Sequence, residues 1–253
     1  MEDSYTLFRL FKNTIKMIKI RGYDTSKVNS VVNGDFNNFI SKYSDVESNS
    51  KKNSVQKLLL GPTINKKNMR NHISLIFKKE DGTKILVFFA VSEGKNSLPS
   101  EEVSVFSKIL TDSETLNAII ISTVKLTAQS SNKLLELTGN KNYSIQFFLD
   151  EDMLYNPTEF ILGSRISNDD GINYGIEILN DDEEEDFLDE NKILKSQMPK
   201  IASGGPVAKY YGLKPGQIIK CIRMSVIPNT LINEEIFYRL VINKNLNKLK
   251  KKN

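Results

Sequence analysis

Between residues 73 and 149, short apolar runs alternate with stretches of helical periodicity, and this alternation restricts the fold more than any other feature. The predicted strands are Ile73–Phe77, Ile85–Val91, Ala118–Ile121 and Ile145–Leu149, and the predicted helices are Val103–Leu110 and Ser130–Leu137, the latter capped by Gly139. Strands this apolar have to be buried, so the helices must pack on the sheet that the strands form. The Asp81-Gly82 pair between the first two strands is typical of a hairpin turn.

The segment before this sheet reads as three helices. From Leu7 to Ile20 apolar residues recur at helical spacing, and Gly22 is placed to end that helix. Two helical stretches follow Asp24, and residues 44–54 are polar enough to predict a loop. The first helix also carries four basic residues at steps of three and four, which form one stripe: Arg9, Lys12, Lys16 and Lys19. This basic stripe could contact phosphates, or it could be an ordinary solvent-exposed face.

Charge is strongly segregated along the chain. Lys and Arg against Asp and Glu number 15 to 7 in residues 1–80, 7 to 11 in residues 81–166, 2 to 11 in residues 167–197 and 11 to 2 in residues 198–253. We therefore expect an N-terminal domain over 1–166, an exposed acidic linker over 167–197 with a short helix from about Glu184 to Leu194, and a C-terminal domain over 198–253. The basic ends favour a polyanionic partner.

The C-terminal segment has its own turn and cap signals. Pro206 and Gly212 are placed to begin and end a short helix, and Lys214-Pro215-Gly216-Gln217 has the pattern of a type II turn. Strands are predicted over Ile218–Arg223 and Ile236–Ile242. The basic tail, residues 243–253, holds five lysines and no acid, and we expect it to fray. The predicted fold class is α+β, with a helical and mixed-sheet N-terminal domain and a small C-terminal α/β domain.

Signals for a membrane, a secretory route, a metal or a cofactor are not found in the sequence. No apolar run reaches the roughly 20 residues of a bilayer span, and the first residues are polar rather than a basic and apolar leader. The single cysteine, Cys221, excludes an internal disulfide and fits the nucleus or cytoplasm. His72 is the only histidine, and we expect it to begin a strand in a structural role. Glycine-rich phosphate and dinucleotide motifs are absent, so neither a cofactor nor a small-molecule substrate is predicted.

A nuclease is the enzyme class that comes closest to the predicted topology. Nucleases with this order of elements hold Mg²⁺ through carboxylates on adjacent strands. The corresponding strand here, Ile85–Ala90, contains no carboxylate, and Glu80 and Asp81 lie in the turn. The sequence thus disfavours a nuclease and predicts that the chain is not an enzyme.

A specific resemblance begins at Met198. The segments are Met198-Pro199-Lys200-Ile201, then Gly205-Pro206-Val207-Ala208-Lys209-Tyr210-Tyr211-Gly212 running on through Gly216 and Lys220 to Arg223, then Phe237-Tyr238-Arg239-Leu240-Val241. In this order they resemble the C-terminal assembly domain of the fifth subunit of eukaryotic nuclear DNA-directed RNA polymerases, whose archaeal counterpart consists of that domain alone. Looser similarity at Arg21-Gly22-Tyr23, Val87-Phe88-Phe89 and Leu126-Thr127-Ala128 extends to the N-terminal "jaw" domain of the eukaryotic form.

The resemblance implies a non-catalytic polymerase subunit that acts in transcription. The C-terminal domain would dock on the largest subunit, and the jaw would lie beside downstream double-stranded DNA. The implied subunit-interface residues are Pro206, Tyr210, Tyr211, Arg223, Tyr238 and Arg239. The implied DNA-proximal residues are the basic stripe of Arg9, Lys12, Lys16 and Lys19 together with Lys125, Thr127 and Gln129 in the loop after the third strand.

The chain also departs from the family pattern. The His-x-Leu-Val-Pro-x-His segment after the jaw corresponds to Phe160–Ile166, which keeps only the leucine, and Gly205 and Ala128 replace an expected Asp and Pro. With a composition rich in Asn and Lys, these departures suggest a large cytoplasmic DNA virus or a divergent eukaryote, and hence a nucleus, or a viral factory and virion. The alternative function is a free-standing nucleic-acid-binding protein, and a nuclease is the more distant one.

Overall fold

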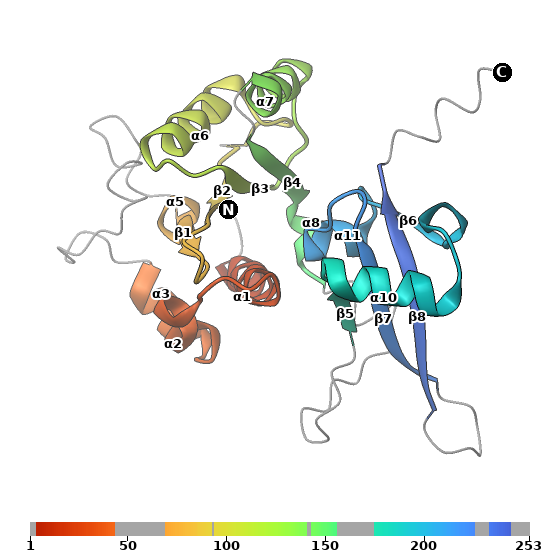
Figure 1. The fold of residues 1–253 in the computed structure, drawn as a ribbon. Coiled ribbons are helices and arrows are strands. Elements are labelled where there is room, and N and C mark those ends of the chain that lie inside the picture. Colours follow the sequence, from red (N-terminus) through yellow and green to blue (C-terminus); the bar gives the residue numbers. More distant parts are fainter. Residues whose placement is uncertain are drawn as a thin grey trace. The chain divides into compact units, whose positions relative to one another are not determined.

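The computed structural model describes residues 4–43, 69–92, 94–140, 143–155, 175–225 and 233–243. The chain folds into two compact units, Met1–Tyr155 and Asn156–Asn253, each with its own sheet and helices, so the predicted α+β class is confirmed (Figure 1). Among the described residues, no helix is both long enough and apolar enough to cross a membrane.

The first unit is built on a four-stranded sheet of order β1-β2-β3-β4, with β1 (Leu75–Lys78), β2 (Lys84–Phe89), β3 (Asn117–Ser122) and β4 (Ser144–Leu149). β1 and β2 pair antiparallel, whereas β2, β3 and β4 are parallel. The predicted hairpin is confirmed: Gly82 has a φ of 82°, and the Lys79 N–H donates to the Thr83 carbonyl at 2.9 Å. The parallel strands are apolar because helices cover both faces of the sheet.

Helices form two layers around this sheet (Figure 1). α6 (Ser100–Asp112) and α7 (Ala128–Asn140) cover one face, where the Phe88 and Phe106 rings lie 5.5 Å apart. α1 (Ser4–Ile20) covers the other, with the Phe11 ring 6.4 Å from that of Phe89. The prediction that Gly139 caps this helix is wrong, since α7 runs through that glycine to Asn140.

The helical segment follows the predicted periodicity. After α1 come η1 (Ser26–Val28), α2 (Asn29–Val32), α3 (Phe36–Tyr43) and α5 (Met69–Ile73), and α8 (Asp150–Met153) follows β4. Gly22, with a φ of 82°, ends α1 as predicted. The predicted position of His72 at the start of a strand is wrong, because it lies in α5, where its buried ring places Nδ1 3.1 Å from the Tyr43 carbonyl oxygen. The loop predicted over 44–54 falls outside the described residues.

The second unit has a sheet of order β5-β7-β8-β6, formed by β5 (Gly175–Ile178), β7 (Ile218–Ser225), β8 (Asn233–Ile242) and β6 (Lys200–Ala202). Its helices are α10 (Asp181–Asn191), η2 (Lys195–Gln197) and α11 (Pro206–Tyr211). The predicted helix limits are confirmed, since Pro206 is the first residue of α11 and Gly212 ends it with a φ of 68°. The predicted type II turn is also present, with a φ of 97° at Gly216.

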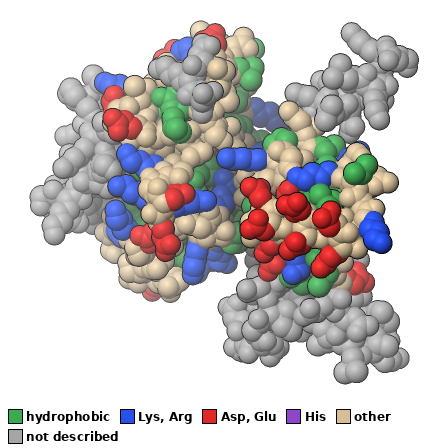
Figure 2. All heavy atoms as spheres, viewed as in Figure 1, with side chains coloured by type: hydrophobic (Ala, Val, Ile, Leu, Met, Phe, Trp, Pro, Cys, Tyr) green, Lys and Arg blue, Asp and Glu red, His purple; other side chains and the backbone are tan. Residues whose placement is uncertain are grey.

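The acidic stretch predicted as an exposed linker over 167–197 is folded in its described part. β5 pairs with β7, and α10 overlaps the short helix predicted from about Glu184 to Leu194 but begins and ends three residues earlier. The cause is visible in two contacts: the Asn180 side chain caps α10 by accepting from the Glu183 N–H, and the Phe187 ring stacks on Tyr238 with centroids 4.0 Å apart. The acidic residues reflect one exposed helix face rather than a solvated spacer (Figure 2).

Candidate subunit and nucleic-acid interfaces

The basic stripe lies along the outer face of α1. Arg9, Lys16 and Lys19 are exposed and Lys12 is half-buried, while the opposite face of the helix is the core of the unit. The Lys12 Nζ lies 5.9 Å from the centroid of the Phe8 ring. Ten residues separate Arg9 from Lys19, so the stripe extends over about 15 Å of helix.

α1 is fixed in position by a contact at the edge of the stripe. The Asn13 amide donates to the carbonyls of Met153 and Leu154, at 3.1 and 2.9 Å, and so caps the C-terminal end of α8. α8 begins with three acids, Asp150, Glu151 and Asp152. The basic stripe is thus held against the sheet but has acidic residues on the neighbouring short helix.

The loop after β3 is well tied to its surroundings. The Thr127 hydroxyl accepts from the Ser130 N–H at 3.0 Å at the start of α7, and the Ser130 hydroxyl donates to the Leu98 carbonyl at 2.8 Å. The Leu98 N–H donates to the Lys125 carbonyl at 2.9 Å. The side chains of Lys125 and Gln129 are exposed and that of Thr127 is half-buried, so Thr127 acts in the structure as a helix cap.

In the second unit, α11 covers one face of the sheet. Ala208, Leu213, Ile219, Cys221 and Val241 form the core between helix and strands, and Tyr211 packs against them half-buried. Tyr210 is 2% exposed, so its ring belongs to the interior of the unit rather than to its surface. Pro206 is exposed at the start of the helix.

Arg239 lies on the same side of the sheet as this core. It pairs with Ile219 in the β7–β8 register, and its guanidinium carbon lies 5.4 Å from the centroid of the Phe237 ring. Burial raises the pKa of the Cys221 thiol to about 11, and the positive charge of Arg239 acts in the opposite direction. Arg239 therefore carries a half-buried positive charge beside an aromatic ring.

Tyr238 lies on the other side, under α10. Successive strand residues point to opposite faces, and Tyr238 stacks on Phe187 of α10. The Glu184 carboxylate accepts from the Ile218 N–H at 2.8 Å and pairs with Lys195, which fixes α10 on this face.

The structure thus separates the predicted interface residues into three groups. Pro206, Tyr211 and Arg239 belong to the α11 side with exposed or half-buried side chains, Tyr210 is interior, and Tyr238 is covered by α10. Arg223 is opposite Glu235 in the strand register, and its side chain falls outside the described residues.

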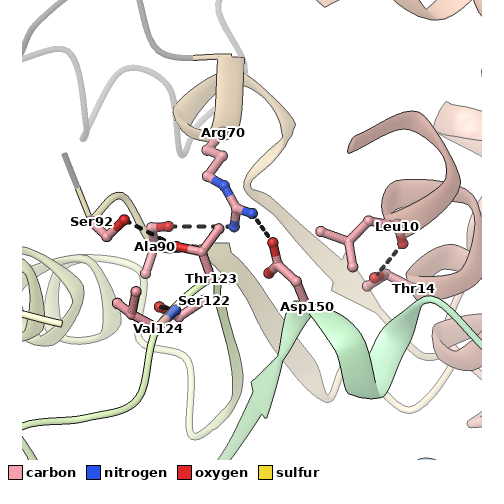
Figure 3. A network of polar contacts seen from close by, with 9 residues as sticks. All are labelled: Leu10, Thr14, Arg70, Ala90, Ser92, Ser122, Thr123, Val124 and Asp150. Carbon is pink, nitrogen blue, oxygen red and sulfur yellow. Dashed lines mark hydrogen bonds and ion pairs between the residues drawn. The ribbon is translucent and has the colours of Figure 1, made fainter. Parts of the chain in front are cut away.

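A buried ion pair that the sequence did not predict lies at the carboxyl ends of the parallel strands (Figure 3). Arg70 of α5 is 2% exposed; its guanidinium donates to the Asp150 carboxylate, which follows β4, and to the Ala90 carbonyl after β2, the latter at 3.4 Å. A neighbouring contact joins the Ser92 and Thr123 hydroxyls at 3.0 Å. The signal missed in the sequence was an acid directly after an apolar strand.

The described residues offer little for metal chemistry. No group of three or more His, Cys, Asp or Glu side chains able to hold a metal ion occurs among them. β2, where a nuclease would carry a carboxylate, has five buried apolar residues from Ile85 to Phe89. Asp150 and Arg70 pair with each other in the interior instead.

Comparison with known proteins identifies relatives of both units. The family model for the C-terminal domain of RNA polymerase Rpb5 matches residues 173–241, which include strands of the second sheet from β5 to most of β8. The subunit Rpo5 of the DNA-directed RNA polymerase of Archaeoglobus fulgidus is 42% identical over 66 residues, which cover 26% of this chain and 82% of the relative.

Two eukaryotic relatives extend the similarity into the first unit. Subunit RPABC1 of DNA-directed RNA polymerases I, II, and III from Caenorhabditis elegans is 23% identical over 242 residues, 95% of this chain and 97% of the relative. Its Dictyostelium discoideum counterpart is 26% identical over 165 residues, 65% of this chain and 76% of the relative. The resemblance predicted from the sequence is confirmed: this chain belongs to the Rpb5 family of RNA polymerase fifth subunits.

Proposed function

We propose that this chain is a non-catalytic subunit of a multisubunit DNA-directed RNA polymerase. In this proposal the second unit docks on the largest subunit, and the first unit lies against downstream double-stranded DNA. The observation that carries the proposal is the match of residues 173–241 to the Rpb5 C-terminal domain, together with relatives that are themselves polymerase subunits.

The α11 side of the second unit is the surface best suited to a protein partner. Tyr211 and Arg239 are half-buried there, and Pro206 is exposed. Tyrosine and arginine are enriched at the energetic centres of interfaces because they combine a large contact area with directed hydrogen bonds. The guanidinium of Arg239 would pair with a carboxylate of the partner in two-pronged fashion. Tyr210 would support this surface from inside, and Arg223 of β7 is a further candidate interface residue.

The basic stripe on α1 supports contact with the DNA backbone. Four cations along about 15 Å of helix face a polyanion whose strands carry a phosphate every 3.4 Å or so along the axis. Such contacts neutralise phosphates without reading bases, which suits a subunit that must hold any sequence. Lys125 and Gln129 are exposed on a separate loop and would add contacts, with Thr127 holding the loop in shape.

The site of action follows from the proposed complex. The eukaryotic relatives are subunits of polymerases I, II, and III, which favours the nucleus. A viral factory and virion would replace the nucleus if the source is a large DNA virus.

A free-standing nucleic-acid-binding protein is the alternative that the basic stripe alone would also support. The two functions differ in stoichiometry. Affinity purification of the tagged chain from its native source, followed by quantitative mass spectrometry, should recover the large polymerase subunits at a fixed ratio to the chain. Recovery of the chain without polymerase subunits would reject the polymerase proposal in favour of the alternative.

The DNA contact is tested separately on the purified chain. Replacing Arg9, Lys12, Lys16 and Lys19 by glutamate should weaken binding to a labelled duplex and reduce the slope of log K against log salt concentration, because each lost phosphate contact removes about 0.9 of slope. A slope equal to that of the wild type would assign the stripe to solvation.

A further inference from the structure

The basic stripe of α1 ends beside the β1–β2 hairpin, where a further lysine is held in place. The Lys79 Nζ lies 5.0 Å from the centroid of the Tyr23 ring. A Cβ placed on Gly22, the residue that ends α1, would lie only 4.0 Å from the same nitrogen. The Asp24 N–H also donates to the Lys78 carbonyl at 2.8 Å, so the segment that follows α1 is tied to the end of β1.

We infer that the nucleic-acid surface of the first unit continues from α1 onto this hairpin, with Lys79 as an anchored phosphate-binding cation. The inference rests on the proposed DNA contact and extends it to residues outside the stripe. Lys79 is near Gly22, which lies three residues after Lys19, so this cation would continue the row beyond the end of α1. Lys78 is exposed next to it.

The Tyr23 ring gives Lys79 a property that a freely moving surface lysine lacks. A lysine fixed over an aromatic face has already lost much of its side-chain freedom, so binding a phosphate costs less additional entropy. Tyr23 is 9% exposed and is therefore a fixed support rather than a mobile side chain. Its surroundings are charged, since both Arg21 and Asp81 influence the pKa of its phenol, which burial raises above the ordinary value.

Two exposed acids follow Lys79 in the turn, Glu80 and Asp81, and Asp81 is the one whose carboxylate interacts with Lys79. Its carboxylate accepts from the Thr83 N–H at 2.7 Å, which fixes it in the turn, and this hydrogen bond together with Lys79 lowers its pKa. It thus stays ionised near Lys79 and reduces the local positive potential. An asparagine would keep the turn hydrogen bond, since its side-chain oxygen can accept in the same way, but would remove the charge.

Lys79 and Asp81 carry opposite charges, so substitutions that remove these charges should change the affinity for DNA in opposite directions. Binding of the full-length protein to a labelled duplex is measured by fluorescence anisotropy over a range of salt concentrations. The plot of log K against log salt concentration has a negative slope. Lys79→Gln should make this slope shallower by about 0.9, and Lys79→Arg should leave it unchanged. Asp81→Asn should tighten binding at low salt, and the gain should fade as salt screens the charge.

The matched control is Lys108→Gln, because Lys108 is exposed on α6, on the other face of the sheet. It should leave the slope unchanged, and melting curves should show that all variants are folded. If Lys79→Gln behaves like Lys108→Gln while reversal of the α1 stripe reduces the slope, the hairpin is not part of the surface but the proposed DNA contact stands.

The remaining outcomes also decide the question. If neither Lys79→Gln nor reversal of the stripe changes the slope, the proposed DNA contact itself fails. If Lys79→Gln weakens binding of a polyglutamate peptide but not of the duplex, the hairpin recognises an acidic protein segment, and the inference is overturned.

Discussion

At the scale of single residues, the Arg70–Asp150 pair of the first unit places a charged guanidinium in the interior, where its desolvation costs free energy. The side chain of Arg70 is 2% exposed, so its guanidinium has lost its hydration, and the Asp150 carboxylate and the Ala90 carbonyl help to offset that loss. The pair also connects three elements, since Arg70 belongs to α5, Ala90 follows β2 and Asp150 begins α8. We therefore expect it to hold the carboxyl ends of the parallel strands together.

Removing one partner of this pair should be costly. Asp150→Asn leaves the Arg70 charge buried without its carboxylate, and the unfolding free energy should fall by about 3–5 kcal/mol. Urea denaturation followed by circular dichroism measures the change. The double substitution Arg70→Met with Asp150→Leu removes both charges and should recover most of the loss. Equal stability of Asp150→Asn and the wild type would show that the pair contributes nothing.

Cys221 should be protected from thiol reagents in the folded chain. It is buried between α11 and the sheet, and its pKa is raised to about 11 from 9.0. Because the unfolded thiol ionises first, this group's contribution to stability is complete below about pH 9 and is lost as pH rises towards 11. At pH 8 a disulfide reagent should react slowly with the native chain and rapidly in urea. Equal rates in both states would contradict the burial of this thiol.

At the scale of elements, α10 shows where reading the sequence fails. Eight of its eleven residues are acidic, so the sequence predicted an exposed linker with only a short helix from about Glu184 to Leu194. Its order comes from Asn180 at its start and from contacts distant in sequence, Phe187 with Tyr238 and Glu184 with the Ile218 N–H. Such contacts cannot be seen in a local window, whereas α11 was predicted correctly because Pro206 and Gly212 are local signals.

The C-terminal end of α10 holds a strained residue. Lys192 ends the helix in the left-handed conformation, with a φ of 52° and a ψ of 43°, where glycine is favoured. Lys192→Gly should raise the thermal midpoint, because the left-handed conformation costs a non-glycine residue about 1–2 kcal/mol and the greater entropy loss of glycine offsets only about 0.5–1 kcal/mol of that. The reverse change at a matched site, Gly212→Ala, should lower it, because Gly212 has a φ of 68°. A lower midpoint for Lys192→Gly would show that the lysine side chain contributes more than the strain costs.

At the scale of the whole molecule, the sequence predicted the first sheet and two of the four strands of the second, β7 and β8, because apolar strands and glycine turns are local signals. It did not predict β5 and β6, which are short and are ordered by pairing with β7 and β8. For the candidate interfaces, helical spacing placed the basic stripe on one exposed face of α1. The same spacing could not show that Tyr210 is interior or that α10 covers Tyr238, since both depend on packing.

Because β5 and α10 are part of the second unit, the fragment that docks should begin before Met198. A fragment that starts at Met198 lacks β5 and α10, so β7 loses a paired strand and Tyr238 loses Phe187. We propose the division at Tyr155 and Asn156 as the domain boundary in place of the expected 167–197 linker. A fragment of residues 156–253 should therefore be more soluble and more resistant to proteases than one of residues 198–253.

The central claim is that the second unit attaches this chain to the largest polymerase subunit, and co-expression with that subunit tests it most directly. The tagged intact chain, a 1–155 fragment and a 156–253 fragment are compared by the amount of largest subunit that each retains. The intact chain and the 156–253 fragment should retain similar amounts, and the 1–155 fragment far less. Full retention by the 1–155 fragment, with none by 156–253, would contradict the claim.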